Sequence, residues 1–166
     1  RFGIKISERD VTALFSKAFN LKITSSSISG FMDQLKEEAL PIYKELLAAL
    51  KKGSFIHADE TGQPLGGINH WLWKLSNKKV CYSHIDKGRG QSVVEKLLGN
   101  KYNGVLISDF LSAYNRIQAK AKQRCLAHIS RDLDKVMEYW HDDSEVMRYC
   151  KRLKKIFEDA IELYED

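Results

Sequence analysis

The stretch FIHADET, residues 55–61, decides the fold and raises the first functional question. Ile56 and Ala58 alternate with Phe55 and His57, which is the period of a β-strand with two distinct faces. The apolar run then meets two adjacent carboxylates at residues 59 and 60. Packing alone gives no reason for acid there, because an isolated carboxylate is costly to bury. The pattern therefore predicts a strand whose end carries a functional acid.

Further strand-like stretches predict a mixed sheet. HWLWKLS (residues 70–76) and VCYSHID (residues 80–86) alternate in the same way, which indicates an antiparallel meander with the first strand. A short amphipathic helix is expected over residues 91–99, and GVLISDF (residues 104–110) is a second buried strand that stops at an acid. A polar helix, a fifth strand at KQRCLAH (residues 122–128) and helices from residue 129 complete the order. We therefore expect an α/β fold with a mixed five-stranded sheet and flanking helices.

The first fifty residues favour helices. SERDVTALFSKAF (residues 7–19) has helical spacing behind a capping serine, a second helix is expected to begin near residues 25–27, and a third to run from Pro41 to Lys51. Short helices joined by a polar turn are typical of a helix-turn-helix, although such pairs also serve only in packing. We expect a helical segment over residues 1–52, a core over residues 53–135, and the start of a helical insertion over residues 136–166.

Asp59 and Asp109 each close an apolar strand. If the two strands are neighbours, both carboxylates project from the same end of the sheet. Close carboxylates repel each other, and a divalent cation with oxygen ligands, such as Mg²⁺, removes that conflict. Two such ions, about 3.5–4 Å apart, serve an in-line displacement at phosphorus. The alternative is that each aspartate only caps a turn.

The charge distribution favours a polyanionic partner. The net charge is +5, and residues 111–155 carry eleven basic and six acidic side chains, with the excess greatest at RIQAKAKQR (residues 116–124). A basic patch of this kind suits a phosphate backbone, and an ordinary solvated surface is the alternative. Three scattered cysteines with no CxxC pair indicate a reducing, cytoplasmic setting. No apolar run approaches about 18 residues, so no membrane span is expected.

Three motifs, HADET, SDFLSAYN and QRCLAHISRDL, resemble those of the transposases of the insertion sequence 66 family, and the resemblance runs in consistent order from Ile6 to Asp134. It implies a DDE-type enzyme with a ribonuclease H-like catalytic domain and a two-metal site for Mg²⁺ or Mn²⁺. The implied partners are transposon ends and target DNA, in a bacterial cytoplasm at the nucleoid. The resemblance leaves open whether the protein forms a homo-oligomer.

Residue by residue, the resemblance makes Asp59 the first catalytic acid and metal ligand, and Asp109 the second. Cys125 and His128 match a C-x-x-H motif expected to support the site. The same pair also reads as half a zinc site, or as a packed cysteine with a nearby histidine. Candidate DNA-binding side chains lie in and just after the basic stretch: Arg116, Lys120, Lys122, Arg124 and Arg131. Arg131 has the alternative of pairing with an acid on its own helix.

The third acid of the family pattern is a glutamate on a later helix. Glu138, Glu145, Glu158 and Glu162 lie in no recognisable motif, so we expect this acid beyond Asp166. The expected function is phosphodiester hydrolysis and strand transfer by a DNA transposase, of which this chain is a part. The rivals are a ribonuclease H-like nuclease that only hydrolyses, and a catalytically incomplete DNA-binding module from a decayed element.

Overall fold

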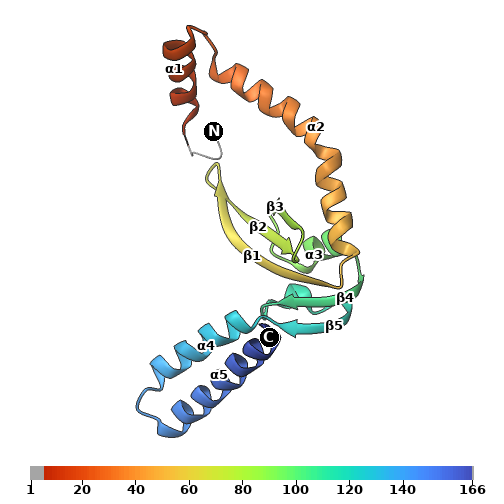
Figure 1. Ribbon diagram of the computed structural model, residues 1–166, viewed down its shortest axis with the longest axis vertical. Helices are drawn as coiled ribbons and strands as arrows, with labels where there is room; N and C mark the ends of the chain where they lie inside the picture. Colours follow the sequence, from red (N-terminus) through yellow and green to blue (C-terminus); the bar gives the residue numbers. More distant parts are fainter. Residues whose placement is uncertain (1–5, 166) are drawn as a thin grey trace. The chain divides into compact units, whose positions relative to one another are not determined.

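The computed structural model describes residues 6–165, with side chains described as far as Leu163 (Figure 1). The chain divides into two compact units at Glu45 and Leu46. The first unit is helical, and the second contains the sheet with its associated helices.

The first helix, α1 (Glu8–Phe19), begins at the predicted capping serine. The backbone N–H of Asp10 donates to Ser7 Oγ at 3.2 Å, and Asp10 Oδ2 accepts from the Ser7 N–H at 3.3 Å. This reciprocal pair satisfies two of the N–H groups that the first turn leaves without partners. The helix ends at Asn20, whose left-handed φ of 51° is tolerated best by glycine and asparagine.

The second helix, α2, is a single element over Ser25–Lys51, so the prediction of a separate third helix from Pro41 is wrong. Pro41 lies inside α2 and removes one backbone donor. The residues on both sides of it, KEEAL and KELLAAL, are among the strongest helix formers, and they continue the helix past the proline. The last turn of α2 belongs to the second unit, where Leu50 is fully buried.

The second unit is built on a five-stranded mixed sheet in the order β3-β2-β1-β4-β5. The strands are β1 (Phe55–Leu65), β2 (Ile68–Ser76), β3 (Cys81–Asp86), β4 (Lys101–Ser108) and β5 (Gln118–Arg124). Strands β1 to β3 form an antiparallel meander, whereas β4 pairs parallel with β1, and β5 pairs parallel with β4. This mixed sheet with flanking helices, preceded by a helical segment, confirms the predicted fold class.

Three sequence predictions about the sheet and its connections need correction. Strand β1 does not stop at Asp59 but continues to Leu65 as a ribbon with β2; only its pairing with β4 ends there. The polar helix expected after Asp109 is just the short turn η1 (Ser112–Tyr114), and the fifth strand is QAKAKQR rather than KQRCLAH. A strand at the edge of a sheet needs few apolar residues and tolerates lysine. The polar composition of β5 therefore favoured a helix in the sequence-based prediction.

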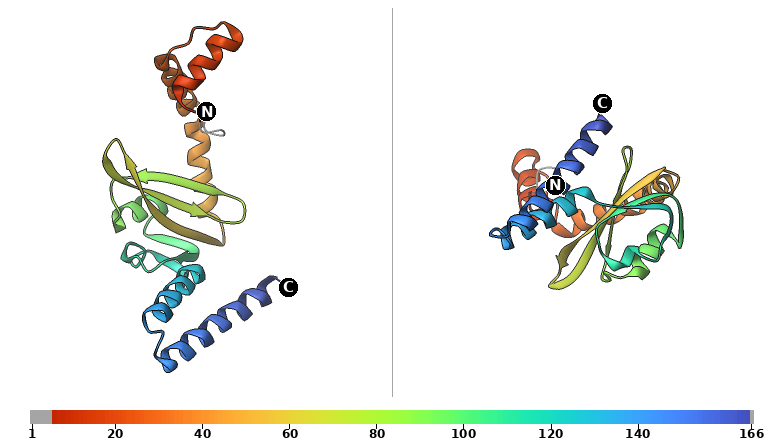
Figure 2. Two further views of the ribbon diagram at one scale, coloured as in Figure 1. Left: turned by 90° about the vertical axis from the view of Figure 1, so that its left-hand side faces the viewer. Right: turned by 90° about the horizontal axis from the view of Figure 1, so that it is seen from below.

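One face of the sheet carries the core. The buried side chains that point into this core include Ile56, Ala58, Trp73, Leu75 and Leu106. Helix α3 (Gln91–Leu98) and η1 lie on this face, and α3 buries four apolar side chains there (Figure 2). The Trp73 indole N–H donates to the Gly88 carbonyl at 3.1 Å, so the one polar atom of this buried ring has a partner.

Helices α4 (Leu126–Tyr139) and α5 (Ser144–Glu165) follow β5 and form an antiparallel hairpin (Figures 1 and 2). Lys154 of α5 donates to Asp134 of α4, which ties the two helices together. Within residues 6–165, no helix combines the length and the apolar character that crossing a membrane requires.

Candidate active site

The register of the two central parallel strands brings two aspartates together. Ala58 of β1 pairs with Ser108 of β4, so the next residues along the chain, Asp59 and Asp109, leave the paired region side by side. Carboxyl ends of neighbouring parallel strands are where open α/β sheets place their ligand sites. The predicted acids therefore lie on adjacent strands and at the same end of the sheet.

The loop that carries Asp109 is fixed by hydrogen bonds at both ends. Asp109 Oδ1 accepts from the Leu111 N–H at 2.9 Å, which closes a tight turn directly after β4. The Asp109 carbonyl accepts from the Arg124 guanidinium on β5. The second carboxylate oxygen of Asp109 takes no hydrogen bond from any side chain or backbone group that the structure describes. This arrangement holds the side chain in place and leaves an oxygen available for a cation.

The C-x-x-H pair begins helix α4 and adds a histidine to the two acids. Cys125 is the residue before the helix, and its N–H donates to the Ser108 carbonyl at 2.8 Å, which fastens α4 to the end of β4. One turn on, His128 Nε2 lies 3.8 Å from Asp59 Oδ1. The other ring nitrogen, Nδ1, is buried without a hydrogen-bond partner. The motif thus places an imidazole against the first acid.

Asp59, Asp109 and His128 offer one ligand atom each, and these atoms all lie within 4.8 Å of one another. Carboxylate oxygens are the ligands that Mg²⁺ and Mn²⁺ take in proteins, whereas imidazole suits Zn, Cu, Fe and Ni. Among the side chains described, residues 6–163, this is the only such group of three. The glutamates considered for the third acid are exposed on α4 and α5 and are not part of this group of ligands: Glu138, Glu145, Glu158 and Glu162.

Glu60 is the buried acid that the sequence reasoning left without a role. It lies on the face of β1 opposite to Asp59, and only 1% of its side chain is exposed. Arg89 donates from Nε and Nη2 to Glu60 Oε1 at 3.2 and 3.0 Å, and the Tyr114 hydroxyl donates to Oε2 at 2.9 Å. The sequence carries a signal for this burial, because successive side chains of a strand point to opposite faces. Glu60, the residue after Asp59, therefore shares the core face with Ala58 and needs hydrogen-bond partners there.

Burial raises the pKa of the Glu60 carboxyl above its usual value. Hydrogen bonds from Tyr114 and Arg89 oppose this rise in pKa, and the nearby charge of Asp109 adds to it. Burial also raises the pKa of the Tyr114 phenol, which therefore stays protonated and remains a donor. Glu60 follows Asp59, and Tyr114 lies five residues after Asp109. The hydrogen bond from Tyr114 to Glu60 therefore links the two chain segments that carry the acids.

The five predicted DNA-binding side chains divide into two groups. Lys122 and Arg124 hold the loop after β4: Lys122 donates to the carbonyls of Tyr114 and Asn115, and Arg124 lies 5.0 Å from the Phe110 ring centre. Arg116, Lys120 and Arg131 are exposed. The Arg131 Nε donates to the Ala127 carbonyl at 3.4 Å, which is a contact within its own helix.

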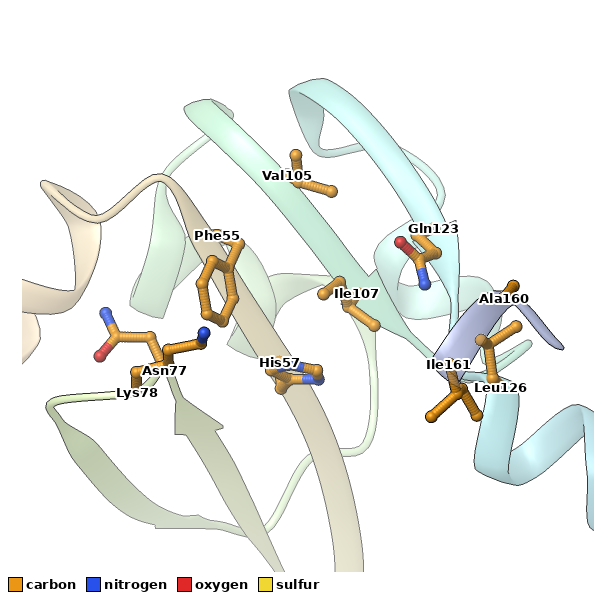
Figure 3. A pocket seen from close by; sticks show the side chains of 10 residues that line it. All are labelled: Phe55, His57, Asn77, Lys78, Val105, Ile107, Gln123, Leu126, Ala160 and Ile161. Carbon is orange, nitrogen blue, oxygen red and sulfur yellow. The ribbon is translucent and has the colours of Figure 1, made fainter. Parts of the chain in front are cut away.

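The face of the sheet opposite to the core forms a groove of about 700 Å³ beside the acids (Figure 3). Strands β1, β4 and β5 supply its floor, and Leu126 of α4 and Ile161 of α5 line one side. The strand residues that project into it are Phe55, His57, Val105, Ile107 and Gln123. Asp59 shares this face of β1 with His57, although neither acid lines the groove itself.

Comparison with known proteins returned one family. The family described as Transposase IS66 family has a model that matches residues 9–165, nearly the whole chain. No curated protein and no solved structure matched the chain significantly. The family match covers both acids, the C-x-x-H pair and the helices of both units.

Proposed function

The chain belongs to the transposase IS66 family, and from this premise we propose that it hydrolyses phosphodiester bonds at transposon ends and transfers the freed 3′ end to target DNA. The observation that supports the proposal is the meeting of Asp59, Asp109 and His128 within 4.8 Å, at one end of two parallel strands. Within this group, His128 Nε2 approaches Asp59 Oδ1 to 3.8 Å.

The two carboxylates fit a divalent cation. Asp59 is 60% exposed, so its carboxylate keeps access to solvent and to a hydrated ion. Mg²⁺ is held by one or two carboxylates and completes its shell with water and phosphate oxygens, which matches an open pair of acids. When bound, Mg²⁺ or Mn²⁺ supplies Lewis-acid stabilisation of the attacking and leaving oxygens in an in-line displacement at phosphorus.

The protein groups contribute position and charge. Asp59 and Asp109 would hold the cation and present it to a phosphate lying over the end of the sheet. Cys125 would act through the backbone, because its bond to Ser108 sets the start of α4 and with it the place of His128. We assign His128 and Cys125 this supporting role and keep the role of metal ligand for the two acids.

The exposed cations of the predicted set suit the DNA backbone. We propose that Arg116, Lys120 and Arg131 contact phosphates, while Lys122 and Arg124 act by holding the loop after Asp109. Alanine at both Arg116 and Lys120 should reduce the dependence of log affinity on log salt concentration by about two, since each neutralised phosphate contributes about 0.9 to that slope. The equally charged pair Lys79 and Lys87, both exposed, provides the control. Equal slopes for the two double variants would rule out this footprint.

The test of the function is an assay that separates cleavage from joining. The complete gene product is incubated with labelled transposon-end DNA and a target plasmid in Mg²⁺ or Mn²⁺. We expect cleaved ends and joined products, both dependent on the cation. Cleavage without joining would favour the ribonuclease H-like nuclease, and DNA binding without either product would favour a catalytically incomplete module.

A further inference from the structure

A second polar cavity lies on the core side of the sheet, away from the acid pair. It has a volume of about 350 Å³ and lies between the start of α3 and the turn η1. Its lining includes two arginines, Arg89 and Arg116, together with Gly90, Gln91, Ser112 and Asn115. None of Asp59, Asp109 and His128 lines it, and neither does any other acid. The cavity is therefore positively charged and separate from the candidate metal site.

Arg89 is fixed on one edge and open on the other. Two of its five N–H donors bond to the buried carboxylate of Glu60, and its guanidinium carbon lies 4.2 Å from the centre of the Trp71 ring. The remaining three donors take no acceptor within the described part of the chain, and 47% of the side chain is exposed. An arginine held in this way loses little conformational freedom when it binds an anion.

Two further features make the cavity suit a phosphate. Arg116 is exposed and forms no ion pair or hydrogen bond with any residue that the structure describes. The residue before α3 is Gly90, which has no side chain to cap the helix. The Val93 N–H donates to the Gly90 carbonyl at 3.2 Å, whereas the N–H groups of Gln91 and Ser92, at the positive end of the helix dipole, take no acceptor that the structure describes. Arginine forks and backbone N–H groups at a helix start are the groups that proteins use to bind phosphate.

We propose that this cavity binds a phosphodiester of the DNA backbone and thereby positions the strand whose scissile phosphate lies at Asp59 and Asp109. The inference rests on the proposed function, because it takes DNA as the substrate. The connection to the acids is direct: Glu60, which orients Arg89, follows Asp59, and its other partner, Tyr114, lies in the loop after Asp109. Glu60 thus connects Arg89 to the two chain segments that carry the acids.

Gly90 allows a test that leaves the arginines and Glu60 unchanged. A Cβ added at Gly90 meets nothing within 4 Å, and the backbone there is extended, with φ −99° and ψ 177°. Aspartate and asparagine are both good N-caps, so Gly90→Asp and Gly90→Asn should fold at least as well as the wild type. Only Gly90→Asp places a negative charge where the phosphate would bind.

The measurement is fluorescence anisotropy with a labelled duplex of mixed sequence over a range of salt concentrations. Gly90→Asp should weaken DNA binding about tenfold, as expected for a lost charged hydrogen-bond site, and reduce the salt slope by about one. Gly90→Asn, which caps the same N–H groups without adding a charge, should weaken DNA binding less than Gly90→Asp does and should keep the wild-type salt slope. Inorganic phosphate, titrated separately and followed by thermal shift, tests whether the cavity takes free phosphate instead.

The outcomes separate this inference from the proposed function. If the wild type shows no salt-dependent DNA binding, the proposed function fails. If the wild type binds DNA and Gly90→Asp binds with the same affinity and slope, the phosphate site is overturned while the proposed function stands. Loss of inorganic phosphate binding with unchanged DNA binding would identify a site for free phosphate and would equally overturn a backbone site.

Discussion

Asparagine in place of Asp59 or Asp109 is expected to abolish cation-dependent cleavage and joining by the complete gene product. The substitution keeps the shape of the side chain and removes one charge from the pair that would hold the cation. Lewis-acid stabilisation of a phosphoryl transfer is worth several kcal/mol. Because about 1.4 kcal/mol corresponds to a factor of ten in rate, we expect a loss of about 10³-fold or more in the rate of cleavage.

The loss of activity should be accompanied by a change in a second readout, metal binding. Mn²⁺ binding by the 166-residue chain, followed by electron paramagnetic resonance, should be weak in the wild type and weaker still in either variant. Asp142→Asn is the matched control, since Asp142 has a 93% exposed side chain at the tip of the α4–α5 hairpin and should change neither readout. Full activity in Asp59→Asn or Asp109→Asn would contradict the assignment of these residues as metal ligands.

The sheet was predictable from the sequence because its central strands obey simple rules. FIHADET and GVLISD alternate or run apolar as buried strands do, and the meander has short turns with Gly66 and Gly67, both at positive φ. The boundaries were less predictable. The end of the β1–β4 pairing is decided by the neighbouring strand and not by β1 itself, so Asp59 resembled a strand end while β1 continued to Leu65.

The edge strand and the long helix show two further limits of the sequence. QAKAKQR owes its strand conformation to pairing with β4, and nothing in its own composition favours a strand over a helix. Pro41 is a reasonable first-turn residue, but strong helix formers on both sides kept α2 continuous. In both cases the surroundings decided the conformation: pairing with β4 made QAKAKQR a strand, and the helix formers on both sides of Pro41 kept α2 continuous.

The sequence suggested which acids could form a site, but it did not suggest the hydrogen bonds that Arg89 and Tyr114 make to Glu60 beside them. Asp59, Asp109 and the C-x-x-H pair occur in motifs, so their positions in sequence suggested a shared place in the fold. Arg89 and Tyr114 reach Glu60 from 29 and 54 residues away, and only the packing of α3 and η1 on the core face brings them there. The pairing of a buried acid with distant partners requires the tertiary structure.

Removal of the Glu60 side chain is expected to have the largest effect on stability. Glu60→Ala leaves the buried Tyr114 hydroxyl without an acceptor and Arg89 without its carboxylate. An unsatisfied buried polar group costs about 1–3 kcal/mol, and the half-exposed Arg89 regains water and adds less. With the space left by the side chain, we expect the free energy of unfolding in urea, followed by tryptophan fluorescence, to fall by about 3 kcal/mol. Glu95→Ala, at the partly buried Glu95 of α3, is the control and should cost less.

Glu60→Gln separates the charge of Glu60 from its hydrogen bonds, through the dependence of stability on pH. Since burial raises the pKa of Glu60 in the folded protein, the folded state retains a proton at pH values where the unfolded chain has released it. The wild type therefore loses stability, relative to the glutamine variant, as the pH rises from the ordinary glutamate pKa of 4.5 to the raised value. Unfolding in urea from about pH 4 to about pH 7 measures this difference. A wild-type advantage that grows with pH would mean that Arg89 and Tyr114 lower the pKa of Glu60, and that the ion pair, not burial, governs this side of the site.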